Sequence, residues 1–379
     1  MRLWQDIILD RIVYDIAVIG LGPAGSTFAR LVDSRKLRVA AFDKKDDTEE
    51  SFRKPCGGLL SPDAQKLCAR FSLTLPSDVL VTPQIFSVQT IDLGSEMIRD
   101  YQRFYINMDR HAFDKWLKSL IPDTVEIHDG TVCTAVTKNG DLYEIDVTEN
   151  GSHERYLAKH IVAADGANSV VRRNLFPKHR IKTYMSVQQW FRDEHAKPFY
   201  SCIFDKELTD CYAWGLSKNG YFIFGGAFPV KNARERFESM KTKLEDYGFL
   251  LENPVKTEAC MVLSPTHPWQ FFPGKGKCFF LGEAAGFISP SSLEGISHSF
   301  ESAYRLSELF NVKDDVTASD YRKATLMMRL KLFLKIIKRP FIMNPLLRRI
   351  IMKLGICSIR KIDGDDVFSR DSRQAGNKN

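Results

Sequence analysis

Three short apolar runs, each ending in a glycine-containing turn, set the pattern of the chain. They extend from Ile16 to Ile19, from Ile161 to Ala164 and from Cys278 to Leu281. Apolar runs of this length between turn residues are typical of strands buried on both faces of a parallel sheet. Because a helical pattern follows each turn, the sequence predicts an α/β fold built from strand–turn–helix units.

The first run leads into a GxGxxG pattern where a strand meets a helix. Gly20 permits the tight turn, Gly22 lets the backbone approach a pyrophosphate, and Gly25 lets the helix pack close to the strand. The helix begins near Pro23 and Ala24, and its free N–H groups attract phosphates. These five residues form the first part of a predicted nucleotide site.

A second strand, from Arg38 to Phe42, ends at Asp43. This acid lies about twenty residues past the glycines, where it can accept hydrogen bonds from a ribose diol. We include the neighbouring Lys44 in the predicted site. The motif predicts a dinucleotide but does not by itself distinguish FAD from NAD.

The two later runs also end in turns that carry an acid. Asp165 and Gly166 follow the second run, and a carboxylate at the end of a buried strand is costly unless it is hydrogen-bonded. In open α/β sheets, ligands bind outside the carboxyl ends of the strands, so we predict cofactor contacts at both turns. The predicted contacts of the third turn are Gly282, Glu283, Gly286, Phe287 and Ile288.

Other elements are predicted from periodicity and turn residues. Strands are expected over 79–90, 101–106, 124–133 and 142–148, and helices over 63–71 and 234–250, with another helix capped by Asp109. Residues 182–269 alternate and are rich in aromatics, which favours an antiparallel sheet with one face free to line a pocket.

These patterns predict a discontinuous arrangement of domains. An FAD-binding domain is expected from 1–80, 105–181 and 270–321, and an inserted antiparallel substrate domain from 81–104 and 182–269. Residues 322–379 are expected to form a basic helical C-terminal segment.

Two further positions carry candidate chemistry. Cys56 lies in a Pro-Cys-Gly-Gly loop, where Gly57 and Gly58 allow a flat ligand to come close to the backbone. Cys56 is either a proton donor or a small buried residue. Arg110 follows the capping Asp109, so this cation is badly placed for the helix dipole. It either faces an anion such as a pyrophosphate or is a solvated surface side chain.

Composition narrows the class of protein. The 379 residues are 44% hydrophobic and 27% charged, as in an ordinary globular protein. The eight cysteines and eight histidines show no metal-ligand or disulfide spacing, so we expect no metal site and a reducing compartment. No apolar run reaches the roughly twenty residues that span a bilayer, and no signal peptide is recognised, so a cytoplasmic location is predicted.

The net charge of +7 is concentrated near the C-terminus. Residues 322–361 contain twelve lysines and arginines and no acid, interleaved with apolar residues. Such a segment is able to lie on an anionic bilayer, at the inner membrane face. Alternatively it is a helical cap that packs on the flavin domain, and the two are compatible. No motif supports nucleic acid binding.

Together the three turns resemble the FAD-binding fold of the para-hydroxybenzoate hydroxylase group, with Glu283 where that group usually has aspartate. Within it, the chain is similar to the geranylgeranyl reductase family. Four motifs carry this resemblance: Pro55 to Gly58, then Arg110 with Phe113 and Asp114, then Tyr212 with Trp214, and Leu293 to Ile296. The Phe-Pro half of the family's Tyr-x-Trp-x-Phe-Pro motif is replaced from Gly215 onward.

The resemblance implies an FAD-dependent oxidoreductase that reduces C=C bonds of an isoprenoid lipid. Cys56 is the candidate catalytic residue. Residues expected to line the substrate pocket are Tyr212, Trp214, Phe224 and Leu293. Since no second GxGxxG is present, the electron donor is either NAD(P)H bound transiently or a reduced carrier protein. The alternatives are an FAD-dependent monooxygenase and a flavoprotein that binds a lipid carrier without turnover.

Overall fold

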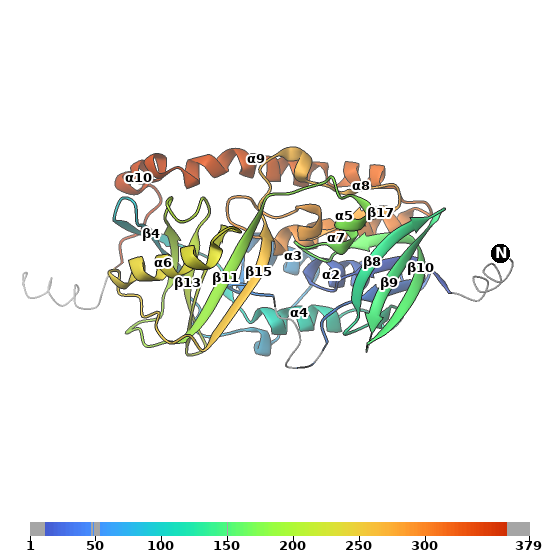
Figure 1. The fold of residues 1–379 in the computed structure, drawn as a ribbon, viewed down its shortest axis with the longest axis horizontal. Helices are drawn as coiled ribbons and strands as arrows, with labels where there is room; N and C mark the ends of the chain where they lie inside the picture. The colour runs from blue at the N-terminus through green and yellow to red at the C-terminus, as the bar shows by residue number, and fades with distance from the viewer. Residues whose placement is uncertain (1–11, 47, 49–53, 150, 362–379) are drawn as a thin grey trace, which may run out of the picture.

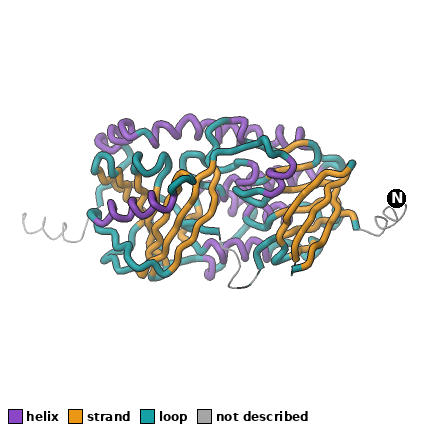
Figure 2. The backbone as a smooth tube through the Cα atoms, viewed as in Figure 1, coloured by secondary structure: helices purple, strands orange, loops and turns teal. Residues whose placement is uncertain are grey.

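The protein was analysed as a computed structural model that describes residues 12–46, 48, 54–149 and 151–361. Two sheets lie toward opposite ends of the molecule, and the C-terminal helices run along one side of both (Figure 1). Figure 2 shows helices packed between and around the two sheets. The predicted α/β class is confirmed.

The first sheet is built from the predicted apolar runs. Its parallel strands are β1 (Val13–Ile19), β2 (Val39–Phe42), β7 (Glu126–His128), β10 (Ser152–Ala163) and β17 (Cys278–Phe280). At its edges, β16 (Gly274–Lys275) pairs antiparallel with β17, and β8 (Val132–Asn139) and β9 (Leu142–Glu149) continue antiparallel from β10. The predicted strand over 124–133 is therefore two strands: β7 joins β2, and β8 forms the hairpin with β9.

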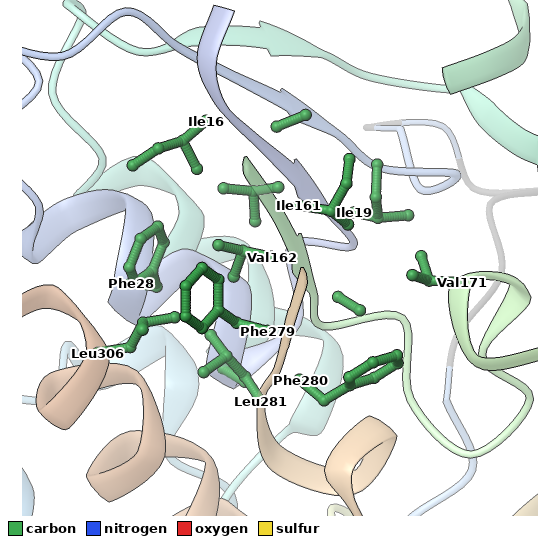
Figure 3. Packing of buried hydrophobic residues seen from close by; sticks show 14 of the residues in the cluster. Ile16, Ile19, Phe28, Ile161, Val162, Val171, Phe279, Phe280, Leu281 and Leu306 are labelled. Carbon is green, nitrogen blue, oxygen red and sulfur yellow. The ribbon is translucent and has the colours of Figure 1, made fainter. Parts of the chain in front are cut away.

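Helices cover the sheet and complete its core. The helix α2 (Pro23–Leu31) packs against α7 (Ile296–Val312) beside the parallel strands. Phe28 and Leu306 from these helices meet Val162 and Phe279 from the strands (Figure 3). Burial of these four side chains fixes the strand ends relative to the helix that follows the first turn.

The second sheet has the order β15-β11-β14-β13-β12-β4-β5. Its strands are β4 (Ser87–Asp92), β5 (Met97–Gln102), β11 (Thr183–Arg192), β12 (Tyr200–Phe204), β13 (Ala213–Lys218), β14 (Tyr221–Pro229) and β15 (Lys256–Leu263). All neighbours are antiparallel except β12 and β4. The helix α6 (Ala233–Glu245) packs on one face of this sheet. A helix is predicted here over 234–250, and the observed helix ends earlier, at Glu245.

The predicted strand over 79–90 is largely wrong. Its first residue ends a short 3-10 helix, Ser77–Val79, and β4 begins only at Ser87. Pro83 explains the error, because a proline has no N–H to donate to a strand pair. The predicted strand over 101–106 likewise becomes the end of β5 and the short β6 (Ile106–Asn107), which pairs with β3 (Leu59–Leu60).

Three shorter helices begin at side-chain caps. They are α3 (Pro62–Arg70), α4 (Arg110–Ser119) and α5 (Val170–Leu175). The Asp109 carboxylate accepts the N–H of Ala112 at the start of α4, which confirms the predicted cap. Ser61 and Ser169 cap α3 and α5 in the same way.

The described part of the C-terminal segment, up to residue 361, is largely helical and packs on the body of the protein. It comprises α8 (Ala318–Ala324), α9 (Leu326–Met343) and α10 (Pro345–Leu354). Residues 362–379 of the predicted helical segment lie outside the described residues. Met328 and Leu332 join the core of the first sheet, whereas Arg348 of α10 forms a buried ion pair with Asp92 of the second sheet. The segment therefore links the two sheets. None of the helices in the described residues is both long enough and apolar enough to cross a membrane.

Candidate functional site

The carboxyl ends of four parallel strands lie in register at one edge of the first sheet. Ile19 pairs with Phe42 on one side and with Ala163 on the other, and Ala163 pairs with Phe280. The backbone continues the pairing into the turns, where Gly20 N–H donates to the Phe42 carbonyl over 2.8 Å. The three glycine turns and Asp43 are thus brought together as the sequence predicts.

The glycines of the first turn have different physical roles. A Cβ on Gly25 would lie 1.8 Å from the carbonyl oxygen of Gly20, so only glycine lets the helix come this close. Gly20 has φ +93° and faces the backbone of Ala164 in the second turn. Around Gly22, by contrast, no atom of the described chain lies within 4 Å of a Cβ position, which leaves its backbone open to a ligand.

The third turn packs against the first. A Cβ on Gly282 would lie 3.1 Å from the Cβ of Ala24 and closer still to Ser299 of α7. Gly286 has φ +75°, and Phe287 and Ile288 after it are buried. Ile288 packs in a cluster with Tyr212 and Leu293. This turn therefore connects the edge of the first sheet to residues predicted to line the substrate pocket.

Two acids at this edge each have one buried oxygen without a partner among the described residues. They are Asp43 Oδ2 and Asp165 Oδ1. The other oxygen of Asp165 accepts the N–H of Val170 over 2.7 Å. Burial raises the pKa of both carboxyls. A buried acceptor without a donor is costly, so a ligand with hydroxyl groups, such as the ribose and ribitol of FAD, fits these positions.

Glu283 makes different contacts from these two acids. One of its oxygens accepts the N–H of Leu263 over 2.9 Å, and the other forms an ion pair with Lys54. Both oxygens are therefore already held by the protein. Glu283 ties the third turn to β15 and to the residue that precedes the Pro-Cys-Gly-Gly loop.

A buried cluster of charges lies beside Cys56. Asp114 binds Arg110 over 2.7 Å and Lys45 over 2.8 Å. Burial alone would raise the pKa of Asp114, but the two cations lower it to about 2. Only 13% of the Arg110 side chain is exposed, so Arg110 is not a solvated surface residue. Lys44, next to Asp43, is exposed to solvent.

Lys218 holds the Pro-Cys-Gly-Gly loop through a hydrogen bond to its backbone. The sequence did not indicate this role. Its ammonium donates to the carbonyls of Gly57 over 2.9 Å and of Met108 over 2.7 Å. Burial lowers its pKa to about 8. A Cβ on Gly58, which has φ +65°, would collide with this ammonium. Before the Asn219-Gly220 turn, a lysine resembles an ordinary solvated turn residue, so no local signal marked it.

On its other side, the loop faces an aromatic group. A Cβ on Gly57 would lie 3.6 Å from Trp214 Nε1, and this indole nitrogen is buried without a partner among the described residues. The Tyr212 ring lies 6.0 Å from that of Trp214, and its hydroxyl donates to the Ser292 carbonyl over 2.5 Å. The structure thus brings Gly57, Tyr212, Trp214 and Leu293 into one region, and their roles toward a substrate stay predictions.

Phe224 lies on the opposite face of the sheet, which corrects its placement in the pocket. In the pairing of β13 with β14, Trp214 is opposite Gly225 and Phe224 is opposite Gly215. Because neighbouring residues of a strand point to opposite faces, Phe224 and Trp214 are on different sides. Phe224 is fully buried against Phe237 of α6, with ring centroids 5.2 Å apart.

The chain is similar to known proteins over most of its length. The chain is 48% identical over 350 residues to the protein CbrA of Escherichia coli O6:H1, covering 92% of this chain and 95% of that one. It is equally similar to CbrA of Shigella sonnei, of which 99% is covered. The chain belongs to the CbrA family. No protein-family model matches it.

Two solved structures illustrate the fold that this chain shares. A geranylgeranyl bacteriochlorophyll reductase-like protein from Thermoplasma acidophilum has a TM-score of 0.77 and 15% identity, covering 96% of this chain and 97% of that one. PqsL of Pseudomonas aeruginosa, a probable FAD-dependent monooxygenase, has a TM-score of 0.64 and 16% identity over 90% of this chain and 99% of that one. These similarities confirm the predicted family resemblance and the para-hydroxybenzoate hydroxylase-type fold.

Proposed function

We propose that the protein is an FAD-dependent reductase of C=C bonds in an isoprenoid lipid. One observation carries the proposal: Lys54, just before the Pro-Cys-Gly-Gly loop, pairs with Glu283 of the third turn, and Gly57 of the loop faces Trp214. The fold of the geranylgeranyl bacteriochlorophyll reductase-like protein, with its TM-score of 0.77, supports the same reading. When bound, reduced FAD supplies a hydride for such a reduction.

The residues around the site then have separate tasks. Gly22 and the start of α2 hold the pyrophosphate, and Asp43 holds the ribose of the adenosine. The aromatic side chains of Tyr212 and Trp214 exclude water and orient an apolar chain. Cys56 is the candidate proton donor for the carbon that does not receive hydride, since it lies in the loop beside Gly57.

The alternative function is that of an FAD-dependent monooxygenase, and the similarity in fold to PqsL supports this alternative. The two activities give different products. A reductase adds two hydrogens to the substrate, whereas a monooxygenase adds oxygen and releases peroxide when uncoupled. A flavoprotein that binds a lipid carrier without turnover would give neither product.

Mass spectrometry of polyprenyl lipids incubated with the photoreduced protein tests the proposal. Photoreduction avoids a choice between NAD(P)H and a carrier protein as the electron donor. A gain of two hydrogens supports the reductase, and unchanged lipid masses across a panel of chain lengths would reject it. A Cys56→Ser variant that keeps FAD and full reductive turnover would remove Cys56 as the proton donor.

A lipid substrate also has a consequence for where in the cell the protein works. We propose that the protein works at the cytoplasmic face of the inner membrane, because an isoprenoid lipid is available there. Cell fractionation with and without a high-salt wash tests this location. Recovery of all of the protein in the soluble fraction at low salt would contradict it.

A further inference from the structure

The helix α9 has two apolar faces, and only one of them packs on the protein. Met328 and Leu332 are buried in the core of the first sheet. A second series is exposed to solvent: Leu326, Leu330, Leu334, Ile337 and Phe341. Spacings of three and four residues place this series on one side of the helix, which we call the α9 stripe.

Exposed apolar residues are also present after α9. On α10, Leu346, Ile350 and Leu354 are spaced by four residues and are exposed, Leu354 by 68%. Ile359, exposed by 41%, follows them and lines an open hollow of about 680 Å³ together with Phe86. Large apolar surfaces on a soluble domain mark a binding site for a partner or a membrane.

The orientation of these helices is fixed by two buried arginines. Arg339 donates to the Tyr184 hydroxyl over 2.8 Å and to the Asp210 carbonyl over 3.1 Å. Arg348 donates to both carboxylate oxygens of Asp92, over 3.0 and 3.1 Å. Because charged groups are costly to bury without such partners, the helices are held with the stripe outward.

Exposed cations flank the apolar surface. Lys331 and Lys338 are two helical turns apart beside the α9 stripe, and Arg349 and Lys353 lie among the exposed apolar residues of α10. No ion pair joins these four to another described residue. Residues 322–361 contain no acid that could neutralise them locally.

We infer that α9 and α10 lie in the plane of an anionic bilayer, with the α9 stripe inserted below the headgroups and the flanking cations at the lipid phosphates. This is the arrangement that an amphipathic helix with apolar and basic faces adopts at a membrane surface. A second copy of the chain fits less well, since pairing two such surfaces would bring lysines of like charge together.

Vesicle flotation of the full chain tests the inference, without reductant or lipid substrate, so that its outcome is separate from that of the proposed reaction. We expect binding to vesicles that contain phosphatidylglycerol. Binding to vesicles of pure phosphatidylcholine should be at least about tenfold weaker. Leu334→Gln with Ile337→Gln should reduce binding to the anionic vesicles by at least about tenfold. Val312→Gln is the matched control, because Val312 is 78% exposed at the end of α7, and it should bind as the parent does.

A charge variant separates the contribution of the cations from that of the apolar side chains. Lys331→Gln with Lys338→Gln should weaken binding to anionic vesicles by roughly 10- to 30-fold and leave the circular dichroism spectrum unchanged. Three results would overturn the inference: no flotation of the parent chain, equal flotation of the Leu334→Gln/Ile337→Gln variant, or a dimer by light scattering that this variant dissociates.

Discussion

The ammonium of Lys218 donates a hydrogen bond to the carbonyl of Gly57 over 2.9 Å, joining the end of β13 to the Pro-Cys-Gly-Gly loop. The same ammonium binds the Met108 carbonyl just before α4. One buried side chain thus sets the position of the loop beside Trp214.

Replacing Lys218 by methionine should loosen this loop. Two buried carbonyls would lose their donor, which costs about 1–3 kcal/mol for each unsatisfied group. We expect faster hydrogen exchange in the peptide that contains Gly57 and Gly58, with little change at β1. Lys206→Met is the control, because Lys206 is exposed in the same domain. Unchanged exchange in the loop peptide would show that Lys218 does not hold it.

The stability of the protein should also respond to Lys218 at alkaline pH. Burial lowers the pKa of Lys218 to about 8, from 10.5 in an unfolded chain. The unfolded state therefore binds more protons between these values, so the free energy of unfolding contributed by this residue rises with pH, by about 3 kcal/mol in all. Urea unfolding of the parent and of Lys218→Met at pH 7.5, 9 and 10.5 measures the difference. A difference that stays constant or falls over this range would contradict the assignment.

Local patterns in the sequence predicted the strand ends but not the contacts made across the fold. The turns at Gly20, Asp165 and Gly282 were recognised because an apolar run, a glycine and a helix follow one another in the chain. The face of Phe224 depends on which strand it pairs with, and the role of Lys218 depends on Gly57, 161 residues away. Such relationships depend on strand register and on packing between distant residues. Short-range periodicity in the sequence does not predict either of them.

The Asp114 cluster predicts a loss of stability in acid. Its pKa of about 2 lies below the value of 3.8 for an unperturbed aspartate, because Arg110 and Lys45 outweigh the effect of burial. The stabilisation, about 2 kcal/mol, is present above pH 4 and is lost as the pH falls toward 2. Asp114→Asn should therefore cost most near pH 7 and progressively less toward pH 3 in urea unfolding. The exposed Asp123→Asn serves as control, and a pH-independent cost of Asp114→Asn would rule out this coupling.

Replacing Asp43 should not lower the stability of the protein without FAD, but it should weaken the binding of FAD. Without the cofactor, its buried oxygen lacks a donor and the pKa of its carboxyl is raised by burial, so Asp43→Ala should leave the melting temperature unchanged or higher. With FAD, the variant loses hydrogen bonds to a charged acceptor, which weakens binding by about 10- to 100-fold. Titration of apoprotein followed by flavin fluorescence measures the affinity, with Asp141→Ala in the β8–β9 turn as control. An unchanged FAD affinity would remove Asp43 from the site.

The first turn offers a comparison of two glycines three residues apart. A Cβ at position 25 would meet the Gly20 carbonyl oxygen at 1.8 Å, and both atoms belong to backbone that the sheet and helix hold fixed. Gly25→Ala should therefore lower the free energy of unfolding by several kcal/mol, as expected of overpacking in a rigid core (about 1–3 kcal/mol or more). At position 22 no described atom lies within 4 Å and φ is −72°, so Gly22→Ala should keep the stability of the ligand-free protein.

The same Gly22→Ala variant should bind FAD more weakly, because the added methyl group occupies the space through which the backbone approaches the pyrophosphate. Thermal unfolding of both variants as apoprotein, followed by FAD titration, separates packing from ligand contact. If Gly22→Ala bound FAD with the parent affinity, the open space at this turn would not be the pyrophosphate site. If instead Gly25→Ala folded with the parent stability, the helix would be able to move away from β1, and the close contact would not be what requires glycine there.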